Sequence, residues 1–208
     1  ALHDSTSARL ATTMPTRTPE GPDLWQDDWY RPASALASPH FDPRPADAHT
    51  DLIVVHSISL PPGQYGGDEV EALFLGTLNC ASHPYFERLR GLRVSAHFFV
   101  RRSGAVVQFV GCDQRAWHAG ESHYRGRNRC NDDSIGIELE GLEGEAFEPA
   151  QYAALTRLCQ ALAQRYPIAF VAGHDHIAPG RKGDPGAAFD WAQFQQGLRL
   201  PGIHFPAR

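Results

Sequence analysis

The sequence predicts a single-domain α/β (α+β) protein in which helices flank a mixed central β-sheet. Three observations support this prediction. Short apolar runs rich in β-branched residues have the length of buried strands, other segments show helical spacing of apolar residues, and 208 residues suit one sizeable domain but are few for two. Strands and helices are interspersed along the chain, which favours a sheet with helices packed against it.

The N-terminal part of the chain is the least regular. Residues 1–30 are rich in Ser, Thr, Pro and Asp and are predicted to form a partly mobile extension, which leaves residues 31–208 as the domain. Trp25, Trp29 and Tyr30 qualify this boundary, because three large aromatic side chains so close together are expected to pack on the domain surface.

The first half of the predicted domain contains three strands and one helix. Residues 31–50 contain four prolines and no helical pattern, so irregular lead-in chain is expected there. Residues 52–55 are apolar and β-branched, which predicts a buried central strand. Residues 68–78 have near-helical spacing of apolar side chains, and residues 94–102 and 105–110 are predicted to form a β-hairpin.

The second half begins with a predicted long loop. Residues 118–133 show no periodicity, and a loop of this length inside a compact domain is usually functional. Residues 134–140 alternate apolar and polar side chains, which predicts a strand with one polar face. Residues 149–165 are the clearest helix, residues 168–172 read as a buried strand, and a last helix is expected to start near residues 189–191.

The bulk properties exclude several classes of protein. A net charge of −5 argues against a general nucleic-acid binder, which normally carries a basic face. No apolar run approaches the roughly 18 residues that a membrane-spanning helix needs. The 42% hydrophobic and 21% charged content is ordinary for a globular protein.

The cysteines and the N-terminus bear on the compartment. Four cysteines are scattered without a C-x-x-C pair, which favours free thiols in a reducing compartment over two disulfides. Residues 1–18 do not look like an intact signal peptide, so a cytoplasmic location is expected. A signal peptide that has already been removed would instead indicate the periplasm.

Residues 173–186 are expected to form a Gly- and Pro-rich loop that contains imidazoles, a lysine and an aspartate, directly after a predicted buried strand. His174 and Asp184 lie in this segment, and His56 follows the strand at residues 52–55. Two histidines and one carboxylate form a common catalytic zinc set that leaves one position for water. A lone histidine after a strand is more often a hydrogen-bonded core residue, and His97, His118, His123 and His176 are alternative ligands.

Two further residues suit the chemistry of a hydrolase. Glu138 lies between buried positions of a predicted strand, where a carboxylate with a raised pKa could act as a general base. The alternative is a solvent-facing strand residue, and Glu140 on the same face leaves this choice open. Lys182 could stabilise an oxyanion, or it could be an exposed loop lysine. The ring of Trp117 could stack on a sugar, or it could simply pack against other side chains of the protein.

Five blocks of sequence carry a further signal. They are Val-Val-His-Ser-Ile-Ser-Leu-Pro-Pro-Gly at 54–63, Val-Ser-Ala-His-Phe at 94–98, Arg-Ala-Trp-His-Ala-Gly at 115–120, Ile-Gly-Ile-Glu-Leu-Glu-Gly at 135–141, and residues 174–186. In this order, the five blocks resemble the zinc N-acetylmuramoyl-L-alanine amidases. The similarity is greatest to the cytoplasmic AmpD-type enzymes, which act on 1,6-anhydro-muropeptides in cell-wall recycling, and it extends over residues 39–198.

The resemblance implies a fold shared with peptidoglycan recognition proteins and phage amidases. It implies one Zn²⁺ held by His56, His174 and Asp184, with Glu138 as the catalytic carboxylate and Lys182 as the transition-state cation. The expected contacts to the muropeptide substrate are Ser57, Arg93, Ala116, Trp117, His118 and Arg129.

Two positions depart from the family pattern. Ser57 replaces the usual Asn after the first zinc histidine, and its shorter side chain reaches less far toward a substrate. His176 replaces an Asp two residues after the second zinc histidine, and it is expected to point away from the metal.

The predicted reaction is hydrolysis of the amide between the lactyl group of N-acetylmuramic acid and L-alanine, by a monomer. The alternative is a non-catalytic peptidoglycan-binding module, a class that commonly lacks part of the zinc set. A zinc peptidase is disfavoured because no H-E-x-x-H helix is present. The sequence does not choose between soluble anhydro-muropeptides and the intact sacculus as substrate.

Overall fold

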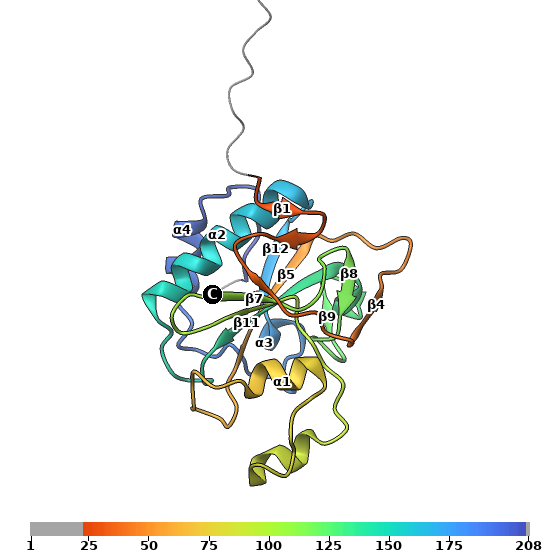
Figure 1. The fold of residues 1–208 in the computed structure, drawn as a ribbon. Coiled ribbons are helices and arrows are strands. Elements are labelled where there is room, and N and C mark those ends of the chain that lie inside the picture. The colour runs from red at the N-terminus through yellow and green to blue at the C-terminus, as the bar shows by residue number, and fades with distance from the viewer. Residues whose placement is uncertain (1–22, 207–208) are drawn as a thin grey trace, which may run out of the picture.

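A six-stranded mixed β-sheet forms the centre of the molecule (Figure 1). The computed structural model describes residues 23–206. The strand order is β12-β5-β11-β6-β7-β3, in which the first four strands are parallel and β7 is antiparallel to β6. This arrangement confirms the predicted fold class. The strands are β3 (Ser34–Ala35), β5 (Leu52–Ile58), β6 (Phe98–Val100), β7 (Val106–Gln108), β11 (Ser134–Glu140) and β12 (Phe170–Gly173).

The predicted helices are present with small differences at their ends. The first ends at Leu75 rather than at residue 78 because Gly76 adopts the left-handed conformation (φ 75°) that commonly ends a helix. The longest matches its predicted bounds and starts with Pro149 in its first turn. The helices are α1 (Glu69–Leu75), α2 (Pro149–Arg165), α3 (His174–Ile177), α4 (Trp191–Leu198) and the 3-10 helices η1 (Pro84–Leu89) and η2 (Cys130–Asp133). Among residues 23–206, none of these helices is long and apolar enough to cross a membrane.

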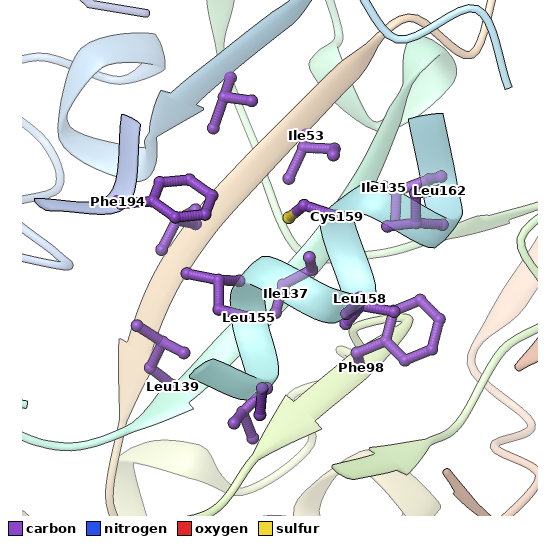
Figure 2. Close-up of a cluster of buried hydrophobic side chains, with 14 of the residues drawn as sticks. Ile53, Phe98, Ile135, Ile137, Leu139, Leu155, Leu158, Cys159, Leu162 and Phe194 are labelled. Carbon is purple, nitrogen blue, oxygen red and sulfur yellow. The ribbon is translucent and has the colours of Figure 1, made fainter. Parts of the chain in front are cut away.

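Side chains alternate between the two faces of the sheet, and this alternation separates the main core from the polar face. Ile135, Ile137 and Leu139 of β11 point toward α2 and α4, where they pack with Leu155 and Phe194 (Figure 2). Each large aliphatic side chain buried in this way contributes about 1.5–3 kcal/mol. The intervening residues of β11 are polar or glycine, and they face the opposite side of the sheet.

The aromatic residues near residue 30 pack on the domain as expected. β1 (Trp25–Gln26) and β2 (Trp29–Tyr30) form a hairpin in which Tyr30 is buried and meets Phe98 edge to face, with ring centroids 6.2 Å apart. The Trp25 ring meets that of Tyr166 at 6.3 Å. Residues 23–30 therefore pack with the domain, whereas the predicted extension over residues 1–22 lies outside the described residues.

Two segments expected to be irregular contain short strands. Within residues 31–50, β3 pairs with the sheet edge and β4 (Phe41–Pro43) pairs with β8 (Gln114–Ala116). Residues 118–133, expected to be a loop, contain the hairpin of β9 (His123–Tyr124) and β10 (Arg127–Asn128), followed by η2. These strands have only two or three residues, which is too few for a periodic pattern to reveal them.

Candidate metal centre and substrate cleft

Strand alternation and register bring His56 and Glu138 together. The two residues are direct partners in the parallel pairing of β5 with β11, and both point to the face opposite α2. His56 Nδ1 lies 3.7 Å from Glu138 Oε1. Both residues lie near the carboxyl ends of their strands, which is where ligands bind in sheets of this kind.

His174 and Asp184 reach the same point from the neighbouring strand. β12 is parallel to β5, and His174 is the first residue of α3 directly after it. This short helix corrects the expectation of a continuous loop over residues 173–186. The chain then turns back, and the Asp175 N–H donates to the Asp184 carbonyl at 2.9 Å.

Three donor atoms converge at this point. His56 Nδ1 lies 3.0 Å from His174 Nδ1 and 3.3 Å from Asp184 Oδ2, while His174 Nδ1 lies 3.2 Å from Asp184 Oδ1. All three ligand atoms fall within 4.8 Å of one another. Donors around one tetrahedral zinc ion, each at about 2.0–2.1 Å from it, are separated by about 3.3 Å. The predicted ligand set therefore fits a single metal ion.

The protonation states also suit metal binding. His174 Nε2 lies 2.9 Å from the Ala119 carbonyl oxygen, which can only accept, so the ring carries its proton on Nε2 and presents the Nδ1 lone pair to the centre. Burial lowers the pKa of His56 to about 4, against the opposing hydrogen bond with Asp184. Burial opposes ionisation of Asp184, but the neighbouring His174 and His56 side chains outweigh it and hold the pKa of this carboxyl below its ordinary value.

The structure distinguishes the two glutamates of β11. Glu138 is buried beside the metal set, and among residues 23–206 its Oε2 has no hydrogen-bond partner. Burial, and then the charge of Asp184, raise the pKa of its carboxyl well above the ordinary value, while Lys182 opposes the shift. Glu140 instead accepts from the Gly66 and Arg102 N–H groups, each at 2.9 Å. The alternative of a solvent-facing Glu138 is therefore wrong.

A cleft of about 450 Å³ opens onto this centre. Glu138, His174 and Asp184 lie in its wall, and Lys182 is an exposed residue on the same wall. An apolar part of the cleft lies between α1 and the segment of η1, which extends away from the rest of the fold (Figure 1). The apolar wall consists of Leu60, Leu73, Phe74, Tyr85, Leu89 and Leu92.

The expected substrate contacts occupy different places. Ser57 and Trp117 line the cleft, and the Trp117 indole stacks on His40 while its Nε1–H donates to Asp42 at 2.9 Å. Trp117 therefore both packs and faces the cleft. Arg93 is exposed between two lining residues but does not itself line the cleft.

Arg129 and Ala116 lie outside the cleft. Arg129 lines an adjoining hollow of about 610 Å³, and Arg181 lines both spaces. Ala116 is 0% exposed within the core and does not line the cleft, so its contact with substrate stays a prediction.

Two other histidines are accounted for. His176 accepts from the Gly173 N–H at 2.8 Å, and its ring packs against Trp191, so it points away from the metal set as expected. His118 lines the cleft, but its Nδ1 lies 2.8 Å from His56 Nε2 and its Nε2 lies 3.0 Å from Ser134 Oγ. It is therefore a neighbour of the metal set rather than one of the three ligands.

Arg181 and Asn131 support the site but were not among the residues predicted from the sequence. Arg181 donates to the Ala119 and Glu121 carbonyls and so ties the segment after α3 to the segment after β8. Its position next to Lys182, in a segment already considered functional, is a signal that could have identified it. Asn131 is buried and accepts two backbone N–H groups, and no local pattern marks it.

The buried histidines predict a fall in stability toward acid in the metal-free protein. His97 is fully buried, and burial lowers its pKa from 6.5 to about 3. Below pH 6.5 the unfolded chain binds a proton at His97, whereas the folded chain leaves this residue unprotonated until about pH 3. The contribution of His97 to the free energy of unfolding is therefore fully present above pH 6.5 and is lost as the pH falls toward 3. Each such group contributes a slope of up to about 1.4 kcal/mol per pH unit.

Urea unfolding of the chelator-treated protein between pH 7.5 and 4.5 measures this slope. His97→Gln should reduce the pH slope of the free energy of unfolding by about the contribution of one proton, because the amide does not titrate. The amide can still accept from the Gly136 N–H and donate to the Gln114 carbonyl, so the hydrogen bonds of the site are kept. An unchanged slope in this variant would contradict the prediction.

The fold and the site together define a class of protein: a mixed-sheet protein with a hydrolase-type metal centre of two imidazoles and one carboxylate beside a buried glutamate. Residues 46–187 match the N-acetylmuramoyl-L-alanine amidase family, and the chain belongs to this family.

Relatives and solved structures agree with this assignment. The chain is 51% identical, over 183 residues, to the 1,6-anhydro-N-acetylmuramyl-L-alanine amidase AmpD of Citrobacter freundii, covering 87% of this chain and 97% of the relative. A crystal structure of a selenomethionine derivative of AmpD superposes with a TM-score of 0.82 at 50% identity, over 85% of this chain and 99% of that one. The Escherichia coli amidase AmiD, solved with the substrate anhydro-N-acetylmuramic acid-L-Ala-D-γ-Glu-L-Lys, gives a TM-score of 0.54 at 30% identity, over 74% of this chain and 60% of that one.

Proposed function

We propose that this chain is a zinc amidase of cell-wall recycling that hydrolyses the amide between 1,6-anhydro-N-acetylmuramic acid and L-alanine of soluble muropeptides. The observation that carries the proposal is the convergence of His56, His174 and Asp184 beside the buried Glu138, on the wall of an open cleft. The names of the relatives that are about half identical over nearly their whole length support the substrate. A binding module would not need this complete set.

The residues present fit one Zn²⁺ ion. His56, His174 and Asp184 would hold it, which leaves a coordination position open. When bound, zinc supplies Lewis acidity, which polarises an amide carbonyl and lowers the pKa of water.

Glu138 and Lys182 carry the remaining steps. The Glu138 carboxylate accepts a proton from the attacking water and passes it to the nitrogen of L-alanine as the amide C–N bond breaks and the new C–O bond remains. Burial raises the pKa of this carboxyl, which makes the carboxylate a stronger base than an ordinary glutamate. Lys182, on the same wall, stabilises the oxyanion that develops on the carbonyl.

The remainder of the cleft binds the two ends of the substrate. The apolar wall and Trp117 receive the anhydro-sugar, while Arg129 in the adjoining hollow receives peptide carboxylates, to which a guanidinium binds in a bidentate manner. Ser57 and Arg93 complete the proposed contacts. The enzyme acts as a monomer in the cytoplasm, and four free thiols suit such a reducing compartment.

The test combines metal analysis with product release. Purified protein should contain about one zinc per chain and should release L-alanyl peptide from a 1,6-anhydro-muropeptide faster than from the non-anhydro muropeptide or from intact sacculi. Equal or faster release from sacculi would overturn the substrate, and zinc-free protein that binds muropeptides without cleaving them would indicate the binding module instead.

A further inference from the structure

A buried hydrogen-bonded relay extends from His56 away from the metal set. His56 Nε2 lies 2.8 Å from His118 Nδ1, and His118 Nε2 lies 3.0 Å from Ser134 Oγ. His118 is 9% exposed and Ser134 is fully buried. Both ring nitrogens of His118 are therefore engaged inside the protein, and neither is free for a substrate.

The fold makes room for this relay. A Cβ atom on Gly136 would lie 2.4 Å from His118 Cγ, so only glycine at this position of β11 allows the imidazole to lie against the strand. Ser134 precedes it by two residues on the same face of β11 and so faces the same ring.

The backbone of His118 and Ala119 also supports His174, the second histidine of the metal set. The buried Asn131 Oδ1 accepts from the His118 N–H at 3.1 Å and from the Ala119 N–H at 2.8 Å, which fixes this backbone. The Ala119 carbonyl then accepts from His174 Nε2 at 2.9 Å. The adjacent residues His118 and Ala119 thus contact the Nε2 atoms of His56 and His174, respectively.

We infer that His118 is a positioning residue that orients His56 for zinc, an inference that rests on the proposed function. For His56 to present its Nδ1 lone pair to a metal, its proton must be on Nε2, where it needs an acceptor. His118 Nδ1 is that acceptor. His118 must then carry its own proton on Nε2 and donate it to Ser134, so the relay has one direction in the zinc-bound protein. This role is distinct from the substrate contact expected from the sequence.

An isosteric pair of variants tests the inference. His118→Leu fills the space without an acceptor, whereas His118→Asn places a carbonyl oxygen near the position of Nδ1. Zinc affinity, measured by chelator competition, should fall by roughly 10–100-fold in His118→Leu, the range typical for loss of an outer-sphere partner. His118→Asn should stay close to the wild-type affinity.

A spectroscopic measurement provides a second, independent result. Imidazole ¹⁵N spectra of the zinc-loaded wild type should show His56 and His118 both protonated on Nε2, and Ser134→Ala should shift the His118 signals. A folded His118→Leu protein with wild-type zinc affinity would overturn the inference, and so would a His118 ring protonated on Nδ1. If His118→Leu does not fold, the wild-type spectrum decides. Failure of the wild type to bind zinc would instead refute the proposed function.

Discussion

Replacing Glu138 with glutamine should lower kcat on a 1,6-anhydro-muropeptide by about 10²–10⁴-fold, the usual contribution of a positioned general base. The amide has the shape of the carboxylate but cannot take a proton from water at neutral pH. Zinc content should be unchanged, because Glu138 is not one of the three convergent donors. Steady-state kinetics and metal analysis of the same preparation measure both quantities.

Glu140→Gln is the matched control for this prediction. Glu140 lies on the same face of the same strand and is also buried, but it accepts from the Gly66 and Arg102 N–H groups and is not one of the convergent donors. Its replacement should lower the melting temperature while the folded protein keeps a kcat within a few-fold of the wild type. A Glu138→Gln enzyme with full activity would show that another group acts as the base.

The sequence predicts that these two glutamates share one face of the strand, but it does not predict which of them lies beside His56. Alternation along residues 134–140 places both on one face, and it correctly separates this face from the apolar core. Which of them faces the metal depends on the register with β5, which pairs Glu138 with His56. Register between strands distant in the sequence is set by packing of the whole sheet and leaves no local pattern.

Two of the three convergent residues could be placed from the sequence. His56 follows apolar residues of a strand, and His174 follows the apolar strand β12, so both lie where parallel strands end on one edge of the sheet. Asp184 was a candidate because it lies in the Gly- and Pro-rich segment after β12, but the segment alone does not place it beside the two histidines. Its place depends on the turn after α3, where the Asp175 N–H holds the Asp184 backbone.

The surroundings of His118 and Ala116 could not be predicted from the sequence. Both lie in a block that resembles the family, which led to the prediction of substrate contacts. Their environments are set by residues distant in the sequence: His56 and Ser134 engage the imidazole, and the core packs around Ala116. A block match identifies a residue as important but does not state which neighbour it contacts.

Asp184→Ala should remove most of the zinc affinity and, with it, amidase activity. Structural zinc sites bind with about 10–16 kcal/mol over four ligands, so one ligand is worth roughly 2.5–4 kcal/mol, or about 10²–10³-fold in affinity. Chelator competition measures the affinity, and the rise of melting temperature on adding zinc reports it independently.

His176→Asp is the control that separates a ligand from a nearby donor. It restores the residue usual in the family, and His176 is two residues from His174 yet points toward Gly173 and Trp191. Zinc added at about 1,000 times its Kd stabilises a folded protein by about 4 kcal/mol. This stabilisation should persist in His176→Asp and fall to about 0.4–1.4 kcal/mol in Asp184→Ala at the same zinc concentration. If instead Asp184→Ala kept the shift and His176→Asp lost it, the third ligand would be His176, and the aspartate would only orient the two imidazoles.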